Sequence, residues 1–361
     1  MKKVVFIGVG LCNPEVYGIQ RYTLEILKAL DRMVPPGVVE LMIAPRDVDN
    51  FNFKNIRVVR IGIKLRFWGN KARTIENYLY RHYYTGRYVR KNGCLSVDLL
   101  LQFPKYGCDV IAIHDCRIEL FPEYTIGNQD RKWAKKLILN QKRAIDRCRM
   151  IITVSLCSKV DIRKVYHVDE NKVIVVPNAW QHFSIVEEDT GIIERLGLKN
   201  KQYFFSLGSR KPHKNIKWVS CAARQNPQYT FVISGSPREY KDFSFEGEIQ
   251  PNMVFAGYLS DAEVKTLYRY CRAFIQPSFY EGFGIPPMEA MSVGADCIVS
   301  NRGSLPEVYK NSVWYINPSD YDHINLDEIM SRPKESNDVI LNGYSWEKSA
   351  QKLWETLKSI M

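Results

Sequence analysis

Two glutamates that flank a glycine-rich loop are the residues of this chain with the clearest capacity for chemistry. Glu281 directly precedes Gly282-Phe283-Gly284-Ile285, and Glu289 follows eight positions after Glu281. Carboxylates accept hydrogen bonds, so a pair of them can bind the paired hydroxyls of a sugar or a ribose. The alternative is structural: Glu289 is a favourable acid in a first helical turn, and Glu281 is a solvated loop residue.

The segment around these glutamates predicts a strand, a loop, a helix and a strand. AFIQPS (273–278) and ADCIVS (295–300) are short apolar runs typical of buried strands. Pro286 and Pro287 suit the first turn of a helix and Gly294 suits its end. The glycine loop is therefore expected before a helix N-terminus, where amide groups and the helix dipole favour an anion or a sugar hydroxyl.

Cations crowd a second expected helix start. Arg210, Lys211 and Lys214 lie between an apolar run that ends at Leu207 and a helix expected from about Asn215. Positive charge is unfavourable at a helix N-terminus unless an anion lies beside it. A diphosphate would satisfy this arrangement, and a solvated basic loop is the alternative.

Two further loops carry candidate residues. DVIAIHD (109–115) leaves His114 and Asp115 at the end of an expected strand, although a histidine there can be purely structural. Gly18 opens a helix, where an N-cap glycine is the simple explanation. The pattern of that helix turns one face inward: Ile19, Tyr22, Ile26 and Leu30.

The alternation of apolar runs with helical segments predicts an α/β fold with parallel sheets. It runs from VVFIGV (4–9) through VDLLLQF (97–103) to KVIVVPN (172–178), and it restarts with YFFSLG (203–208). The polar stretch between them marks a domain junction. We expect an N-terminal acceptor-binding domain at 1–182, a C-terminal nucleotide-sugar-binding domain at 183–340, and a closing amphipathic helix at 341–361 that packs toward the N-terminal domain.

The composition indicates where the protein is located and whether it binds a metal or a cofactor. No apolar run reaches the roughly 20 residues that cross a bilayer, and the first residues do not resemble a signal peptide, so we expect a cytoplasmic protein. The nine cysteines lack a C-x-x-C pair, which indicates neither a zinc site nor disulfides. Gly8 and Gly10 lack the third glycine of a dinucleotide fingerprint, and Asp47-Val48-Asp49 is a chance triplet, so no metal or cofactor is expected.

The net charge of +12 and the pI of about 9.1 call for a polyanionic partner. Basic residues interleave with tyrosines and a tryptophan at 64–91, against the single acid Glu76. This pattern predicts peripheral attachment to an anionic cytoplasmic membrane surface. A solvated face with core aromatics is the alternative. Nucleic-acid binding fits the charge, but it leaves the glutamates and the glycine loop unexplained.

EGFGIPPMEAM (281–291) resembles the signature of glycosyltransferase family 4, whose members are retaining enzymes with the GT-B fold of two Rossmann-like domains around a cleft. The resemblance extends from FAGYLSDAEV (255–264) to WYINPSD (314–320). It implies that Glu281 and His114 lie near the donor sugar, that Glu289 binds the ribose, and that Gly18 lies beside the diphosphate. It assigns the diphosphate to Lys214. The arginine usual before that lysine is His213 here, and Arg210 is the candidate to replace it.

The resemblance implies a metal-independent hexosyltransferase. Its donor would be a GDP-, UDP- or dTDP-hexose, and its acceptor a saccharide or lipid-linked saccharide in surface-polysaccharide synthesis. Lys214, Arg210 and amides of the glycine loop would stabilise the departing diphosphate, and Lys211, Phe283, Gly284 and Ile285 would line the donor site. A phosphorylase or a sucrose-type enzyme of the same fold is the alternative, although such chains are usually longer.

Overall fold

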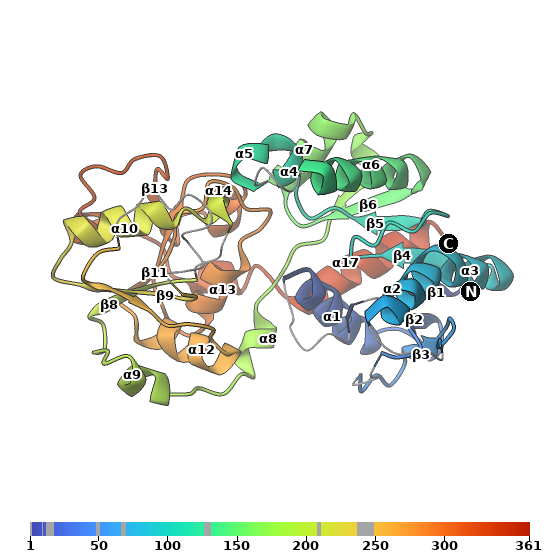
Figure 1. The fold of residues 1–361 in the computed structure, drawn as a ribbon, viewed down its shortest axis with the longest axis horizontal. Helices are drawn as coiled ribbons and strands as arrows, with labels where there is room; N and C mark the ends of the chain where they lie inside the picture. The colour runs from blue at the N-terminus through green and yellow to red at the C-terminus, as the bar shows by residue number, and fades with distance from the viewer. Residues whose placement is uncertain are drawn as a thin grey trace.

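A computed structural model describes residues 2–8, 10–11, 18–47, 51–65, 70–125, 131–207, 211–236 and 249–361. Two sheets organise these residues, and all pairings between their strands are parallel. The first sheet has seven strands in the order β3-β2-β1-β4-β5-β6-β7, and the second has six in the order β10-β9-β8-β11-β12-β13. Helices cover both sheets, and the two α/β halves lie side by side (Figure 1).

The N-terminal half holds the first sheet. Its central strands are buried along their whole length, because helices cover both faces of a parallel sheet. Its elements are β1 (Val4–Ile7), α1 (Gly18–Asp31), β2 (Val39–Ile43), β3 (Arg57–Arg60), α2 (Asn70–Leu79), the π-helix η1 (Tyr80–Tyr84), α3 (Thr85–Asn92), β4 (Leu95–Asp98), β5 (Val110–Ala112), α4 (Arg117–Leu120), α5 (Pro122–Thr125), α6 (Arg131–Arg147), β6 (Met150–Thr153), α7 (Leu156–Tyr166), η2 (Glu170–Lys172) and β7 (Val173–Val175).

A strand-free stretch separates β7 of the first sheet from β8 of the second, as the polar composition there predicts. The C-terminal half begins within this stretch. Its elements are α8 (Gln181–Ser184), α9 (Gly191–Arg195), β8 (Tyr203–Ser206), η3 (Pro212–Lys214), α10 (Ile216–Gln225), β9 (Thr230–Ile233), β10 (Met253–Phe255), α12 (Asp261–Tyr270), β11 (Ala273–Gln276), α13 (Ile285–Ser292), β12 (Cys297–Ser300), α14 (Leu305–Tyr309), β13 (Trp314–Ile316), α15 (Leu326–Ser331), α16 (Asp338–Leu341) and α17 (Trp346–Ser359).

The last helix crosses back to the first half. α17 packs along α1, and its apolar face of Leu353, Trp354 and Leu357 is buried (Figure 1). The chain thus enters the second half through α8 and leaves it through α17, so two segments connect the halves. The domain boundary at 182/183 stays a prediction.

The helix after the glycine loop has the ends that its sequence predicts. α13 carries its prolines at the first positions, and Gly294, just beyond it, has a φ of 82°. One expectation was wrong, since Glu289 is the fifth residue of α13 and no acid lies in its first turn. Because Glu289 is in the second turn, the simple first-turn role does not explain it.

The run VDLLLQF does not form a strand to its end. β4 stops at Asp98, and the buried Asp98 carboxylate accepts hydrogen bonds from the amides of Leu100 at 3.0 Å and Phe103 at 2.8 Å. Leu101 and Phe103 take left-handed φ values of 56° and 44°. An aspartate that bonds to the following backbone converts an apolar run into a turn.

The basic-aromatic stretch is largely helical, from α2 through η1 to α3, while its residues Arg66, Phe67 and Trp68 lie outside the described residues. Its aromatic side chains divide between the core and the surface. Tyr80 is buried and donates to the carbonyl of Met42, whereas Tyr78 and Tyr83 are about half exposed. Glu76 is buried and paired with Arg46 at 2.6 Å.

That pairing removes the one acid of the stretch from the surface. No helix among the described residues is both long and apolar enough to cross a membrane.

Candidate active site

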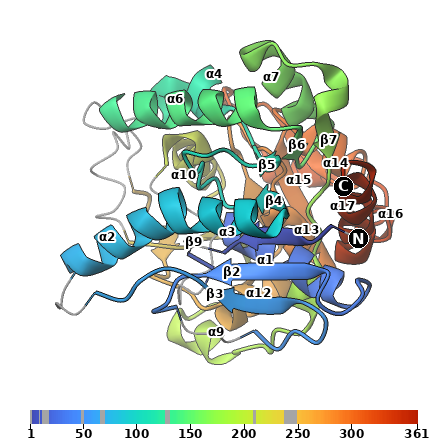
Figure 2. The ribbon, with the colours of Figure 1, turned by 90° about the vertical axis from the view of Figure 1, so that its right-hand side faces the viewer.

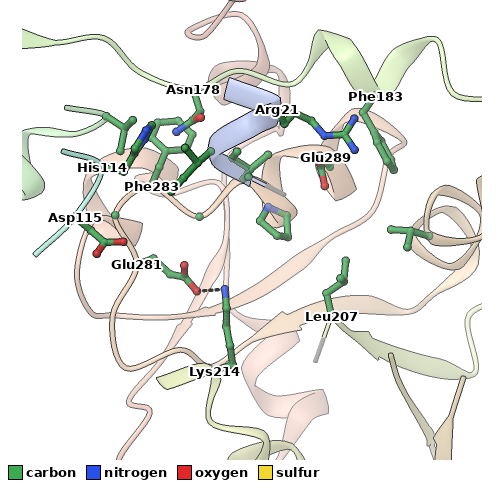
Figure 3. Close-up of a pocket in the computed structure, with 18 of the residues that line it drawn as sticks. Arg21, His114, Asp115, Asn178, Phe183, Leu207, Lys214, Glu281, Phe283 and Glu289 are labelled. Carbon is green, nitrogen blue, oxygen red and sulfur yellow. Dashed lines mark hydrogen bonds and ion pairs between the residues drawn. The ribbon is translucent and has the colours of Figure 1, made fainter. Parts of the chain in front are cut away.

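A cavity of about 450 Å³ lies between the two halves. α1 and the loop after β5 line it on one side, and the β8–α10 loop, the glycine loop and α13 line it on the other. Figure 3 shows Lys214 beside Glu281 in one part of the cavity, and Arg21 with Glu289 in another. The two glutamates are therefore placed to contact different parts of one extended ligand.

Lys214, which follows β8, and Glu281, which follows β11, form an ion pair. The ammonium of Lys214 lies 2.7 Å from Glu281 Oε1, and Gln276 Nε2 donates to the same oxygen at 3.0 Å. Both charged side chains are mostly buried. No described residue hydrogen-bonds the second carboxylate oxygen of Glu281, which can accept from a ligand, while Lys214 keeps further protons to donate.

The histidine at the position of the usual arginine supplies no charge. His213 is fully buried, and its Nε2 accepts from the guanidinium of Arg117 at 2.8 Å. Burial, and then three neighbouring cations, hold the pKa of His213 far below its usual range: Arg117, Lys214 and Lys211. Arg117 comes from the N-terminal half, so it brings a guanidinium to the place where the motif lacks one. Arg210 lies outside the described residues.

Glu289 is oriented by a relay of side chains. His182 Nε2 lies 2.9 Å from Glu289 Oε1, and the Trp346 indole lies 3.2 Å from His182 Nδ1. An indole N–H can only donate, so Nδ1 accepts and Nε2 carries the proton that it donates to the carboxylate. The other carboxylate oxygen of Glu289 remains available to the cavity.

His114 lines the opposite wall as a neutral ring. Its Nε2 lies 3.3 Å from the carbonyl of Leu99, and its ring packs edge-on against Tyr22. Burial lowers the pKa of His114 below its ordinary value. Because a carbonyl can only accept, Nε2 carries the proton and Nδ1 keeps a lone pair.

The glycine loop makes a close contact between the two halves. A Cβ on Gly282 would lie 2.7 Å from the carbonyl oxygen of His114, so only glycine permits this approach. The hydroxyl of Ser155 donates to the Gly282 carbonyl at 2.7 Å. Beside it, the Glu307 carboxylate accepts the amides of Leu156 and Cys157 at the start of α7. These contacts set the position of one half against the other.

The loop also limits which amides can serve a ligand. Gly284 has a φ of 82°, and a Cβ there would lie 2.6 Å from Leu305 Cδ2. Pro286 and Pro287 have no N–H, so the amides left at this end of α13 are those of residues 282–285. Phe283 packs its ring edge-on against Tyr344, and Ile285 lines the cavity.

Other predicted positions are also placed at the cavity or the junction. Gly18 lines the cavity at the start of α1, beside Arg21, which pairs with Asp261 of the second half at 2.7 Å. Lys211 lines an adjoining cavity together with Arg117. Asp47 accepts the amide of Ala44, and its partners in the rejected triplet, 48 and 49, lie outside the described residues.

Sequence reasoning missed Arg117, His182 and Arg21. His182 sits in the polar junction and Arg117 in a short helix, and neither position carries a local pattern that predicts its partner. Arg117 and His213 are 96 positions apart, and His182 and Glu289 are 107 apart. Only the packing of the two halves brings them together.

Comparisons with known proteins agree with this architecture. Residues 189–346 match the family described as glycosyl transferases group 1. The chain is 25% identical over 375 residues to O-antigen chain mannosyltransferase B of Escherichia coli, covering 98% of this chain and 96% of the relative. It is 26% identical over 312 residues to O-antigen chain mannosyltransferase RfbU of Salmonella typhimurium, covering 84% of each.

Among solved structures, sucrose-phosphate synthase from Thermosynechococcus elongatus superposes with a TM-score of 0.75 at 16% identity, covering 100% of this chain and 99% of that one. The fold is therefore GT-B. The chain is a glycosyltransferase, and its residues 189–346 form a group 1 glycosyltransferase domain. The predicted fold class is confirmed, and residues 189–346 match the family that the sequence predicts, whereas the roles of individual site residues stay predictions.

The contact at Gly282 generates a testable prediction. We expect Gly282→Ala to lower the transfer rate by about a hundredfold, because its Cβ pushes the halves apart and a displacement of about 1 Å suffices for such a loss. Gly191→Ala, in a helix away from the cavity, is the matched control and should keep its rate. Thermal unfolding of both variants checks that they fold. A Gly282→Ala enzyme as active as Gly191→Ala would contradict the close contact.

Proposed function

We propose that this glycosyltransferase transfers mannose from a nucleotide-diphosphate donor to a saccharide or lipid-linked saccharide, with retention of configuration and without a metal ion. The observation that carries the proposal is that one cavity holds the Lys214–Glu281 pair, the glycine loop and the oriented carboxylate of Glu289. A nucleotide sugar needs contacts of these kinds: cations and amides for the diphosphate, and carboxylates for hydroxyls.

The departing diphosphate is the most demanding part of the reaction. Breaking the sugar–phosphate bond leaves negative charge on the diphosphate and positive charge on the anomeric carbon. Fixed cations in a cleft of low polarity stabilise such charge strongly. In our proposal Lys214 contacts the diphosphate, Arg117 and Lys211 add positive potential from the side, and amides of residues 282–285 donate hydrogen bonds. The role predicted for Arg210 stays a proposal.

In our proposal different side chains bind the ribose and the sugar of the donor. Glu289 binds the ribose hydroxyls, since His182 holds one of its oxygens and leaves the other for the ligand. Glu281 contacts hydroxyls of the donor sugar, and the lone pair on His114 Nδ1 accepts from another sugar hydroxyl. Gly18 leaves space beside the diphosphate, because a Cβ built there meets no atom of the described residues within 4 Å.

The relatives suggest the sugar and the setting. Both are named O-antigen chain mannosyltransferases, which supports mannose as the sugar and a growing surface polysaccharide as the acceptor. GDP-mannose is the mannosyl donor among the classes considered. A cytoplasmic enzyme, associated with the inner membrane face through 64–91, fits a lipid-linked acceptor. We place its acceptor-binding domain at 1–182, its donor-binding domain at 183–340 and its closing helix at 341–361.

Nucleotide binding tests the assignment of the donor site. Calorimetric titration of the chain with GDP, UDP and dTDP in the presence of EDTA should show GDP binding most tightly. Glu289→Ala should weaken that binding about 10- to 100-fold, since it removes charge-assisted hydrogen bonds to the ribose. His182→Ala should weaken it less, because it loosens the carboxylate without removing it. Glu355→Ala, on the exposed face of α17, is the control.

Two results would contradict parts of this proposal, and a third would change the donor. Equal affinities of the Glu289→Ala and Glu355→Ala proteins would remove the ribose role of Glu289. Nucleotide binding that is lost in EDTA would contradict metal independence. Tight binding of UDP or dTDP in place of GDP would keep the site and exclude GDP-mannose as the donor.

Retention is tested by the product. Proton NMR of the newly formed linkage should show the same anomeric configuration as the donor sugar. In our proposal the transfer takes place on the front face, and the leaving diphosphate accepts the proton of the attacking hydroxyl. A product of opposite configuration would contradict the proposal.

A further inference from the structure

A second, strongly basic pocket lies in the N-terminal half, outside the cavity described above. It has a volume of about 680 Å³ and is bounded by the α2–η1 run, the loop after β4, and α6. Figure 2 shows α6 above the α2–α3 run, with β4 and β5 between them. Among the described residues that line the pocket there is no carboxylate, and their titratable groups are all basic apart from one tyrosine: Arg81, His82, Lys105, Lys136, Arg143, Arg147 and Tyr78.

Among the described residues, none of these cations forms an ion pair with a carboxylate, and the buried Asp98 acts on Arg81 only through its charge. Lys105 donates to the Tyr78 hydroxyl at 2.6 Å, and Arg147 donates to the Lys105 carbonyl. The pKa of His82 is lowered to about 4 by burial and by nearby cations, so this ring is neutral at pH 7. The positive charge therefore comes from five permanent cations, of which Arg81 is partly countered by the charge of Asp98. A bound anion would relieve the repulsion among them.

Two buried polar atoms at the inner wall also lack partners. Arg81 Nε and Gln102 Oε1 are shielded from solvent and make no hydrogen bond to described residues. A buried donor or acceptor without a partner destabilises the folded protein. Such groups are typically satisfied by a ligand or by water. An anionic group beside Arg81 and a hydroxyl beside Gln102 would satisfy both.

The basic pocket is continuous with the candidate active site. Arg81 and Gln102 also line a middle cavity of about 620 Å³, together with Arg73, Arg117 and Lys211. That middle cavity in turn shares Gly18, Ile19 and Asp115 with the donor cavity. The three cavities thus adjoin one another, from the donor site to the basic pocket. They lie beside the loops that follow β4 and β5.

We propose that the basic pocket binds a phosphate or diphosphate group of the acceptor, so that the acceptor's saccharide extends through the middle cavity toward the donor sugar. This inference rests on the proposed function, because it places the acceptor of that reaction. Apolar side chains lie at the same place for a lipid carrier: Tyr78, Leu139 and, nearby on η1 and α6, Tyr83 and Trp133 are 47–56% exposed. A lipid-linked saccharide combines these features, with an apolar tail, a phosphoryl group and a sugar chain in that order.

Matched double variants on α6 test the pocket. Lys136→Ala/Arg143→Ala removes two cations that line it, whereas Lys135→Ala/Lys142→Ala removes two neighbouring exposed cations that do not. Inorganic pyrophosphate is titrated calorimetrically into each protein with a saturating nucleoside diphosphate present, which blocks the donor site. We expect pyrophosphate to bind the wild type and the control alike, and at least about tenfold more weakly to the pocket variant.

The other results overturn the assignment. Equal affinities in both double variants, or no pyrophosphate binding to any protein, would mean that the pocket does not bind the phosphoryl group of an acceptor. Sedimentation with phosphatidylcholine vesicles, with and without phosphatidylglycerol, separates the sources. If only the pocket variant loses binding to the anionic vesicles while its pyrophosphate affinity is unchanged, the pocket holds lipid headgroups instead. Failure of every nucleoside diphosphate to bind would contradict the proposed donor site and leave the pyrophosphate comparison intact.

Discussion

The approach of Gly282 to the backbone of His114 is the constraint on which the rest of the site depends. No side chain fits between the two halves at this point, and the Ser155 hydroxyl and the Glu307 carboxylate fasten the same interface. Once the halves are held in this way, Arg117 reaches His213, and the walls of the cavity face one another. Two connecting segments, α8 and α17, carry the relay that positions Glu289.

Positive charge is balanced differently in the donor cavity and in the basic pocket. Inside the cavity, the charge of Lys214 is balanced by Glu281. Farther along the N-terminal half, no described carboxylate forms an ion pair with the cations of the basic pocket. The difference follows from the kinds of ligand proposed: a donor that must be bound and released in each cycle, and an acceptor that is held by its phosphoryl group.

The local patterns of the chain predicted much of this molecule. Pro286, Pro287 and Gly294 marked α13 correctly, and the alternation of apolar runs predicted two parallel sheets. The end of β4 was wrong because Asp98 bonds to the following backbone, a contact that an apolar run does not reveal. Arg117 and His182 escaped prediction because their partners are distant in sequence and meet only through packing. The basic pocket is likewise a product of tertiary structure, since its residues come from three separate segments.

The central claim is that Lys214 stabilises the leaving diphosphate, and its most direct test is the rate at which nucleoside diphosphate is released from its sugar donor. The account predicts that Lys214→Ala lowers this rate about 10²- to 10³-fold. Lys199→Ala, an exposed lysine outside the cavity, should leave it unchanged. A Lys214→Ala enzyme that releases nucleoside diphosphate as fast as the Lys199→Ala control would contradict the account.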